Sequence, residues 1–198
     1  MNKSILLVVG IILFLSTNSF GQINLKPHIG ANYTSLSSDP NDWLSEAKAG
    51  TVIGLGVQIG GRLYLEPGLQ WTNATVKLVP NVSQLSGDVE MNFVGFRIPL
   101  MVGYRLLGEG DGFNVRIFAG PSVMLNTKSE INSDLPELSE ATINNAIWGA
   151  NIGAGLDFLF LYFEIGYEAG LNTLTKEDIE NWNDPKRNLF YLTLGANL

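Results

Sequence analysis

Residues 161–171 read Leu-Tyr-Phe-Glu-Ile-Gly-Tyr-Glu-Ala-Gly-Leu. Every odd position in this stretch is apolar, whereas the even positions carry Tyr, Glu, Gly, Glu and Gly. Successive side chains of a β-strand point to opposite faces, so this alternation predicts a strand with one apolar face and one polar face.

The same two-residue period recurs in about eight segments of the chain. These expected strands are 23–33, 50–59, 62–73, 89–106, 112–125, 146–157, 159–173 and 188–198. Tight connections at 60–61, at 108–111 and near 157–158 alternate with long polar connections at 34–49, 74–88, 126–145 and 174–187. In outer-membrane barrels the short turns face the periplasm and the long loops face outside. The pattern therefore predicts an all-β fold, an eight-stranded antiparallel up-and-down transmembrane β-barrel in the outer membrane, with both mature termini in the periplasm.

The N-terminal segment has the features of a signal peptide. Lys3 supplies a positive start, residues 5–15 form an apolar run, and Ser19-Phe20-Gly21 offers small residues at the positions that signal peptidase reads. The run is shorter than the roughly 20 residues of a membrane-spanning helix, so cleavage is expected rather than an uncleaved anchor. The expected organisation is a signal peptide at 1–21 and one barrel domain at 22–198.

The composition excludes several classes of protein. The formal net charge is -7, and removal of residues 1–21 takes away Lys3 and no acid, which leaves about -8. Nucleic acid is therefore not an expected partner, because binding phosphates needs a basic surface. The chain contains no Cys, so it has neither a lipoprotein acylation site nor a disulfide framework.

The polar face of the expected strands distinguishes a membrane barrel from a soluble one. Its positions are mostly Gly, Asn, Tyr and Thr with few charges, as in strand 188–198, where Tyr191, Thr193, Gly195 and Asn197 alternate with apolar residues. A soluble barrel would instead expose many Lys and Glu side chains on its polar face. The apolar face is therefore expected to contact outer-membrane lipids.

The charged side chains on the polar face are expected to form a network in the lumen. Its members are Lys26, His28, Glu66, Arg97, Arg105, Arg116, Glu164 and Glu168, with Arg62 and Asp157 on the same face. An eight-stranded barrel filled by such side chains is too narrow for an open channel.

Two details of this interior follow from the short hairpins. The turn at 108–111 is expected to place Leu106 opposite Phe113 and to bring Arg105 and Arg116 into diagonal reach, with Glu66 as the carboxylate that offsets both arginines. Glycines are expected to make room for carboxylates, Gly56 beside Glu66 and Gly153 beside Glu164.

Aromatic side chains stand near both ends of the expected strands, on the apolar face. They are Tyr33, Trp71, Trp148 and Phe190 towards the long connections, and Tyr104 and Phe113 towards the short ones. Such residues form girdles at the two membrane interfaces of outer-membrane barrels, although aromatics are also common in ordinary strands.

Three motifs carry a family resemblance. They are Leu65-Glu66-Pro67-Gly68-Leu69-Gln70-Trp71, Arg97-Ile98-Pro99-Leu100-Met101-Val102-Gly103-Tyr104 and Ala119-Gly120-Pro121-Ser122-Val123. Together they resemble the strand motifs of the PorT-like outer-membrane barrels of Bacteroidetes-type bacteria, over the whole mature chain. The resemblance implies an eight-stranded barrel in a Gram-negative cell envelope and no particular partner.

No pattern in the chain indicates an enzyme. The single His, His28, falls in mid-strand on the polar face, and no spacing of acids resembles a calcium loop. No catalytic residue, cofactor or metal site is expected. The favoured function is a structural or interaction barrel whose long loops contact an envelope or extracellular protein. One alternative is a secreted lipocalin-like barrel that buries its Ile, Leu and Val face around a small apolar ligand. The other is a narrow pore with a water path past Arg97 and Glu66.

Overall fold

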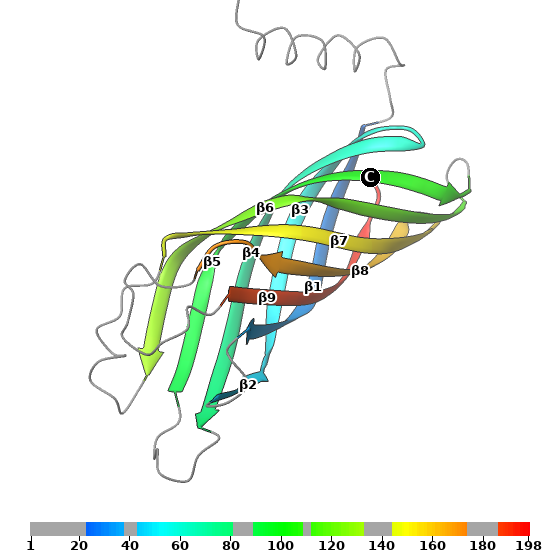
Figure 1. The fold of residues 1–198 in the computed structure, drawn as a ribbon. Coiled ribbons are helices and arrows are strands. Elements are labelled where there is room, and N and C mark those ends of the chain that lie inside the picture. The colour runs from blue at the N-terminus through cyan, green and yellow to red at the C-terminus, as the bar shows by residue number, and fades with distance from the viewer. Residues whose placement is uncertain (1–22, 38–42, 81–88, 109–111, 133–143, 174–185) are drawn as a thin grey trace, which may run out of the picture.

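The computed structural model describes residues 23–37, 43–80, 89–108, 112–132, 144–173 and 186–198. In these residues the chain forms nine β-strands that belong to one closed sheet (Figure 1). No helix among them has the length and apolar character needed to cross a membrane. The expected signal peptide at 1–21 lies outside the described residues.

Apart from the short β2, the strands follow each other around the barrel in chain order. They are β1 (Ile23–Ser37), β2 (Trp43–Ala47), β3 (Ala49–Gly60), β4 (Leu63–Pro80), β5 (Val89–Leu107), β6 (Phe113–Asn132), β7 (Ala146–Phe158), β8 (Leu161–Gly170) and β9 (Lys186–Ala196). All neighbours are antiparallel, and β9 pairs with β1 to close the sheet.

Strands β2 and β3 together occupy one position in this barrel. Both pair with β4, β3 along its first part and β2 along residues 76–80. Between them the Lys48 amide donates to the Thr75 carbonyl at 3.3 Å, so the ladder is nearly continuous. Nine strands therefore fill eight positions, and the predicted eight-stranded antiparallel up-and-down barrel is confirmed.

Two strands, β4 and β6, are much longer than predicted, whereas β5 is longer by one residue. β4, β5 and β6 contain 18, 19 and 20 residues, and their pairing continues to Leu78 opposite Val89 and to Glu90 opposite Asn132. About 9 to 11 residues suffice to cross a membrane. The predicted ends at 73 and 125 are wrong because the apolar alternation stops where strands leave lipid, whereas the hydrogen-bonded ladder continues. The predicted connection 34–49 likewise contains β2.

Both ends of the described chain lie at the end of the barrel that carries the short turns. Leu25 and Leu198 exchange two backbone hydrogen bonds of 2.9 Å, and Ile23 pairs with Ile59 beside the β3–β4 turn. Gly60 has φ +126° there, a conformation that L side chains rarely adopt. In Figure 1, β2 lies at the opposite end from the C-terminus.

The apolar side chains point outward and the polar ones inward. On β8, for example, Ile165 is 40% exposed whereas Glu168 is 1% exposed. The lipocalin-like alternative required the reverse arrangement, with the aliphatic side chains enclosed. It is therefore wrong about which face lines the interior.

Candidate functional site

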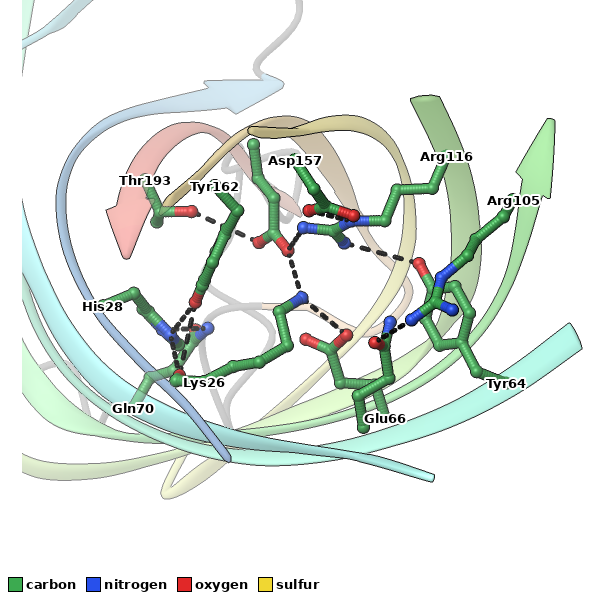
Figure 2. Close-up of polar contacts among 12 residues, drawn as sticks. Lys26, His28, Tyr64, Glu66, Gln70, Arg105, Arg116, Asp157, Tyr162 and Thr193 are labelled. Atoms are coloured by element: carbon green, nitrogen blue, oxygen red, sulfur yellow. Dashed lines mark hydrogen bonds and ion pairs between the residues drawn. The ribbon is translucent and has the colours of Figure 1, made fainter. Parts of the chain in front are cut away.

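The barrel interior contains a cluster of ion pairs around Glu164 of β8. This carboxylate forms an ion pair with Lys26 Nζ at 2.8 Å and with Arg116 Nη2 at 2.7 Å. Lys26 also contacts Glu66 at 2.8 Å, and Arg116 contacts Asp157 at 2.9 Å (Figure 2). Lys26 and Arg116 have no exposed surface, so both charges depend on these carboxylates.

A second cluster surrounds Glu168, four residues further along the same face of β8. Its carboxylate forms ion pairs with Arg97 at 2.6 Å and Arg187 at 2.7 Å, and Ser122 donates to it at 2.6 Å. Arg97 also donates to the side chains of Gln70 and Asn151. In the described part of the chain, Nε and Nη1 of Arg187 have no hydrogen-bond partner. Glu168 is therefore the carboxylate that holds two buried arginines.

His28 and Gln70 connect the two clusters. His28 Nδ1 lies 3.1 Å from the Lys26 carbonyl oxygen, and the Gln70 amide nitrogen lies 3.0 Å from His28 Nε2. These contacts suit an imidazole with its proton on Nδ1, which donates to the carbonyl and accepts from Gln70. The Tyr162 hydroxyl donates to the same carbonyl at 3.2 Å (Figure 2). Both ring nitrogens of His28 are thus engaged in hydrogen bonds inside the barrel.

The eight predicted members of the lumen network therefore all point inward, although some of their partners differ from those expected. Arg105 lies at the margin of the network, where its Nη2 donates to Gln58 at 2.9 Å. Glu66 contacts Lys26 rather than Arg105 or Arg116. The expected role of Glu66 as the carboxylate of both arginines is wrong, because Arg116 reaches Asp157 and Glu164 instead.

The register of the β5–β6 hairpin also differs from the prediction. Arg105 pairs directly with Arg116, and Leu107 pairs with Val115 across a β-bulge. Leu106 is the extra residue of this bulge and lies between the partners of Arg116 and Val115, so it is not opposite Phe113.

Arg62 points away from the lumen, contrary to the prediction. It is an exposed residue of the β3–β4 turn, and its guanidinium lies over the outward ring of Tyr104, 5.3 Å from the ring centroid. Strand β4 begins one residue later, at Leu63, so the alternation of faces does not extend to Arg62.

Aromatic rings packed over glycines form a further interior feature, which the sequence reasoning missed. Cross-strand partners Tyr64 and Gly103, Phe118 and Gly153, Tyr191 and Gly166, and Tyr162 and Gly195 are paired in this way. A Cβ atom added to any of these glycines would meet the ring of its partner. The expectation that Gly153 makes room for Glu164 is therefore wrong, since Phe118 occupies that space.

The sequence reasoning also missed several other interior residues. They either carry no charge or belong to a segment that was expected to be a loop. Gln70, Asn151, Ser122 and Tyr162 stand on the polar face of predicted strands, so their inward direction was available although their partners were not. Arg187 fell in the expected connection 174–187, but it is the second residue of β9.

A small cavity of about 20 Å³ remains between the two clusters, lined among others by His28, Glu66, Gln70 and Arg97. That is room for about one water molecule. Among the described residues, no three His, Asp or Glu side chains are placed to hold a metal ion. The arrangement can lock the strands together through charge pairs, and it leaves little space for a solute.

The six aromatics of the predicted girdles all lie on the outer surface. Their exposed fractions are 43% for Tyr33, 38% for Trp71, 40% for Tyr104, 54% for Phe113, 52% for Trp148 and 37% for Phe190. Tyr33 and Phe190 are direct cross-strand partners, and Phe113 pairs with Phe158 near the short-turn end.

Comparisons with known proteins agree with this geometry. One solved structure of the same fold is the outer membrane protein OprG from Pseudomonas aeruginosa, with TM-score 0.54, 12% identity, and coverage of 91% of this chain and 95% of that one. Another is Ail, the attachment invasion locus protein of Yersinia pestis in complex with the heparin analogue sucrose octasulfate, with TM-score 0.50, 11% identity, and coverage of 88% and 99%. These identities show the fold alone.

A search of curated proteins found no match to this sequence. A comparison with protein families matches residues 16–176, well over half of the chain, to the outer membrane protein beta-barrel domain. With its closed sheet, outward apolar face and filled polar interior, the chain belongs to this family of outer-membrane β-barrels.

Proposed function

We propose that this protein is a structural or interaction barrel of the outer membrane, which holds an extracellular surface for an envelope or extracellular protein partner. The observation that carries the proposal is the contrast between the two barrel ends. At one end are the short turns and both described chain ends, whereas at the other β4, β5 and β6 continue well past the length that crosses a membrane. Long paired strands provide a firm platform for binding.

The orientation and the closer family are part of this proposal. In outer-membrane barrels short turns face the periplasm, which would put both mature termini there and the long strands outside. The three strand motifs support a PorT-like assignment within the family, and export by a signal peptide at 1–21 is consistent with the location.

The filled lumen argues against the narrow pore. A water path would have to pass between Arg97 and Glu168, which touch at 2.6 Å, and between Lys26 and its two carboxylates. We therefore expect no stepwise conductance in planar lipid bilayers, whereas a barrel carrying Arg97→Ala and Glu168→Ala should conduct. Channel events in the unchanged protein would favour the pore.

The interaction role is tested by shortening the long hairpin of β4 and β5. Thr75 pairs with Asn92, so residues 76–91 can be replaced by Asn-Gly, which closes a two-residue hairpin. Cells with either protein are treated with formaldehyde, and cross-linked proteins are identified by mass spectrometry after purification in detergent. We expect the shortened barrel to fold, as shown by heat-modifiable gel migration, and to lose a partner that the full-length barrel captures. The same set of partners for both proteins would contradict a role of this hairpin in binding.

A further inference from the structure

The outer wall of the barrel carries a groove that the proposed function does not use. It has a volume of about 560 Å³ and runs across strands β4 to β9. Its first row of outward side chains follows the pairing Leu63, Tyr104, Ile117, Ala154 and Ile165 from strand to strand. The second row consists of Val102, Ala119, Ile152, Tyr167 and Phe190.

Small side chains form the floor of this groove. Ala154 lies between Ile117 and Ile165, and Ala119 lies between its own cross-strand partners, Val102 and Ile152. A methyl group between larger neighbours leaves a depression in a wall that is otherwise covered by long apolar side chains. The lining is almost entirely apolar, as suits a hydrocarbon chain.

The direction of the groove fits one leaflet of a bilayer. Six strands spaced about 4.8 Å apart give a path of about 24 Å. Strands of such barrels tilt by about 35–45°, so a path along the hydrogen-bond direction rises by about 15 Å. This is about half of the roughly 30 Å hydrocarbon core. The path begins beside the short-turn end, at Leu63, and reaches Phe190 further along the wall.

A fixed cation stands at the short-turn end of the groove. The Arg62 guanidinium lies over the Tyr104 ring, and its Nε donates to the Arg105 carbonyl at 3.2 Å. These contacts hold an exposed positive charge next to Leu63 and Tyr104, which both line the groove. Arginine binds phosphate groups through several donors in one plane. The charge is thus placed where the headgroup of a lipid in the groove would lie.

We propose that this groove is a binding site for one glycerophospholipid, with an acyl chain over Ala119 and Ala154 and the phosphate at Arg62. A phospholipid fits both features of the site, because its acyl chain matches the apolar floor and its phosphate matches Arg62. A hydrocarbon chain alone would make no use of Arg62, and a free anion would make no use of the groove. The site depends only on the barrel wall and the turn, so it can be tested separately from any protein partner.

The test is titration of the detergent-purified barrel with palmitoyl-oleoyl phosphatidylglycerol, followed by native mass spectrometry. Two variants remove the two ends of the site: Arg62→Gln removes the cation and Ala154→Phe fills the floor. Ala31→Phe is the matched control, because Ala31 is an outward residue of β1 outside the groove. Heat-modifiable migration verifies that each barrel is folded, and Ala119→Leu replaces Ala154→Phe if that variant does not fold.

We expect one tightly retained lipid on the unchanged protein and on Ala31→Phe. Arg62→Gln should lower the affinity about 5-fold, the size of one arginine–headgroup attraction. Ala154→Phe should also lower it clearly, because the ring fills the floor of the groove. An equal loss in the control, or a loss in only one of the two site variants, overturns the proposal. Masses of two barrels without lipid would overturn it as well, because the groove would then hold a second copy.

Discussion

The ring of Tyr191 on β9 packs inside the barrel over Gly166, its direct cross-strand partner on β8. Gly166 stands midway between Glu164 and Glu168 on the inward face, so the ring separates the two ion-pair clusters. The Arg97 guanidinium lies over this ring, 5.0 Å from its centroid. Because Gly166 has no side chain, there is room for the Tyr191 ring and for the Arg97 guanidinium that lies over it.

Gly166→Ala should lower the free energy of unfolding by about 1 to 3 kcal/mol, the usual range for overpacking. The added Cβ would meet the Tyr191 ring, which Arg97 prevents from moving freely. Gly61→Ala is the control, because a Cβ there has nothing within 4 Å. Urea titration in lipid vesicles measures both. A double-mutant cycle with Tyr191→Ala should show coupling, and equal effects of the two alanines would contradict the packing argument.

Glu168→Gln should be among the most destabilising single changes in the interior. It would leave Arg97 and Arg187 without their carboxylate, and loss of one partner of a buried ion pair costs about 3 to 5 kcal/mol. Glu66→Gln is the comparison, because Lys26 keeps Glu164 when Glu66 is neutral. Its expected cost is roughly 1 to 2 kcal/mol. Similar losses for both variants in urea titration would show that Glu168 does not hold the two arginines.

The membrane-spanning part of the fold could be predicted from the sequence because its outer face contacts lipid and its inner face contacts a polar interior. Residues 161–171 show this well: lipid outside and a crowded interior together dictate the alternation of Phe163, Glu164, Ile165 and Gly166. Where both faces leave the lipid this constraint ends. The outer parts of β4 and β6 were therefore missed, although their backbone pairing continues.

The direction of an interior side chain was predictable, but its partner was not. Arg116 faces the lumen by alternation alone, whereas its pairing with Glu164 and Asp157 depends on the register of β6, β7 and β8, in which Gly155 is the cross-strand partner of both Arg116 and Glu164. Arg62 shows the limit of the rule itself, because a turn residue does not follow the period of the strand beside it. A single sequence does not reveal either of these features.

Ile165→Arg should cost roughly 2 to 4 kcal/mol, the range for arginine on the lipid face of a barrel near the bilayer midplane. Ile165 points outward and lies in the middle of β8. Ile165→Val keeps the side chain apolar and should change the free energy of unfolding little. Both are compared in vesicles by urea titration. If the arginine variant is as stable as the valine variant, this wall of the barrel does not contact lipid.

The orientation in the membrane can be tested with single cysteines, since the chain contains no Cys of its own. Gly61→Cys marks the β3–β4 turn, where an added side chain has open space. Ser86→Cys marks the connection between β4 and β5. With short turns in the periplasm, a membrane-impermeant maleimide should label position 86 on intact cells and position 61 only after the outer membrane is opened.

The two single-cysteine variants serve as controls for each other, because positions 61 and 86 lie beyond opposite ends of strand β4. Labelling of position 61 alone on intact cells would show that the barrel has the inverted orientation. The long strands could then not display an extracellular surface. Labelling of both positions on intact cells would mean that the reagent crosses the outer membrane. A cysteine-containing periplasmic protein in the same cells checks this, because it stays unlabelled as long as the membrane excludes the reagent. Only the predicted order of labelling places β4, β5 and β6 where an extracellular partner can reach their outer ends.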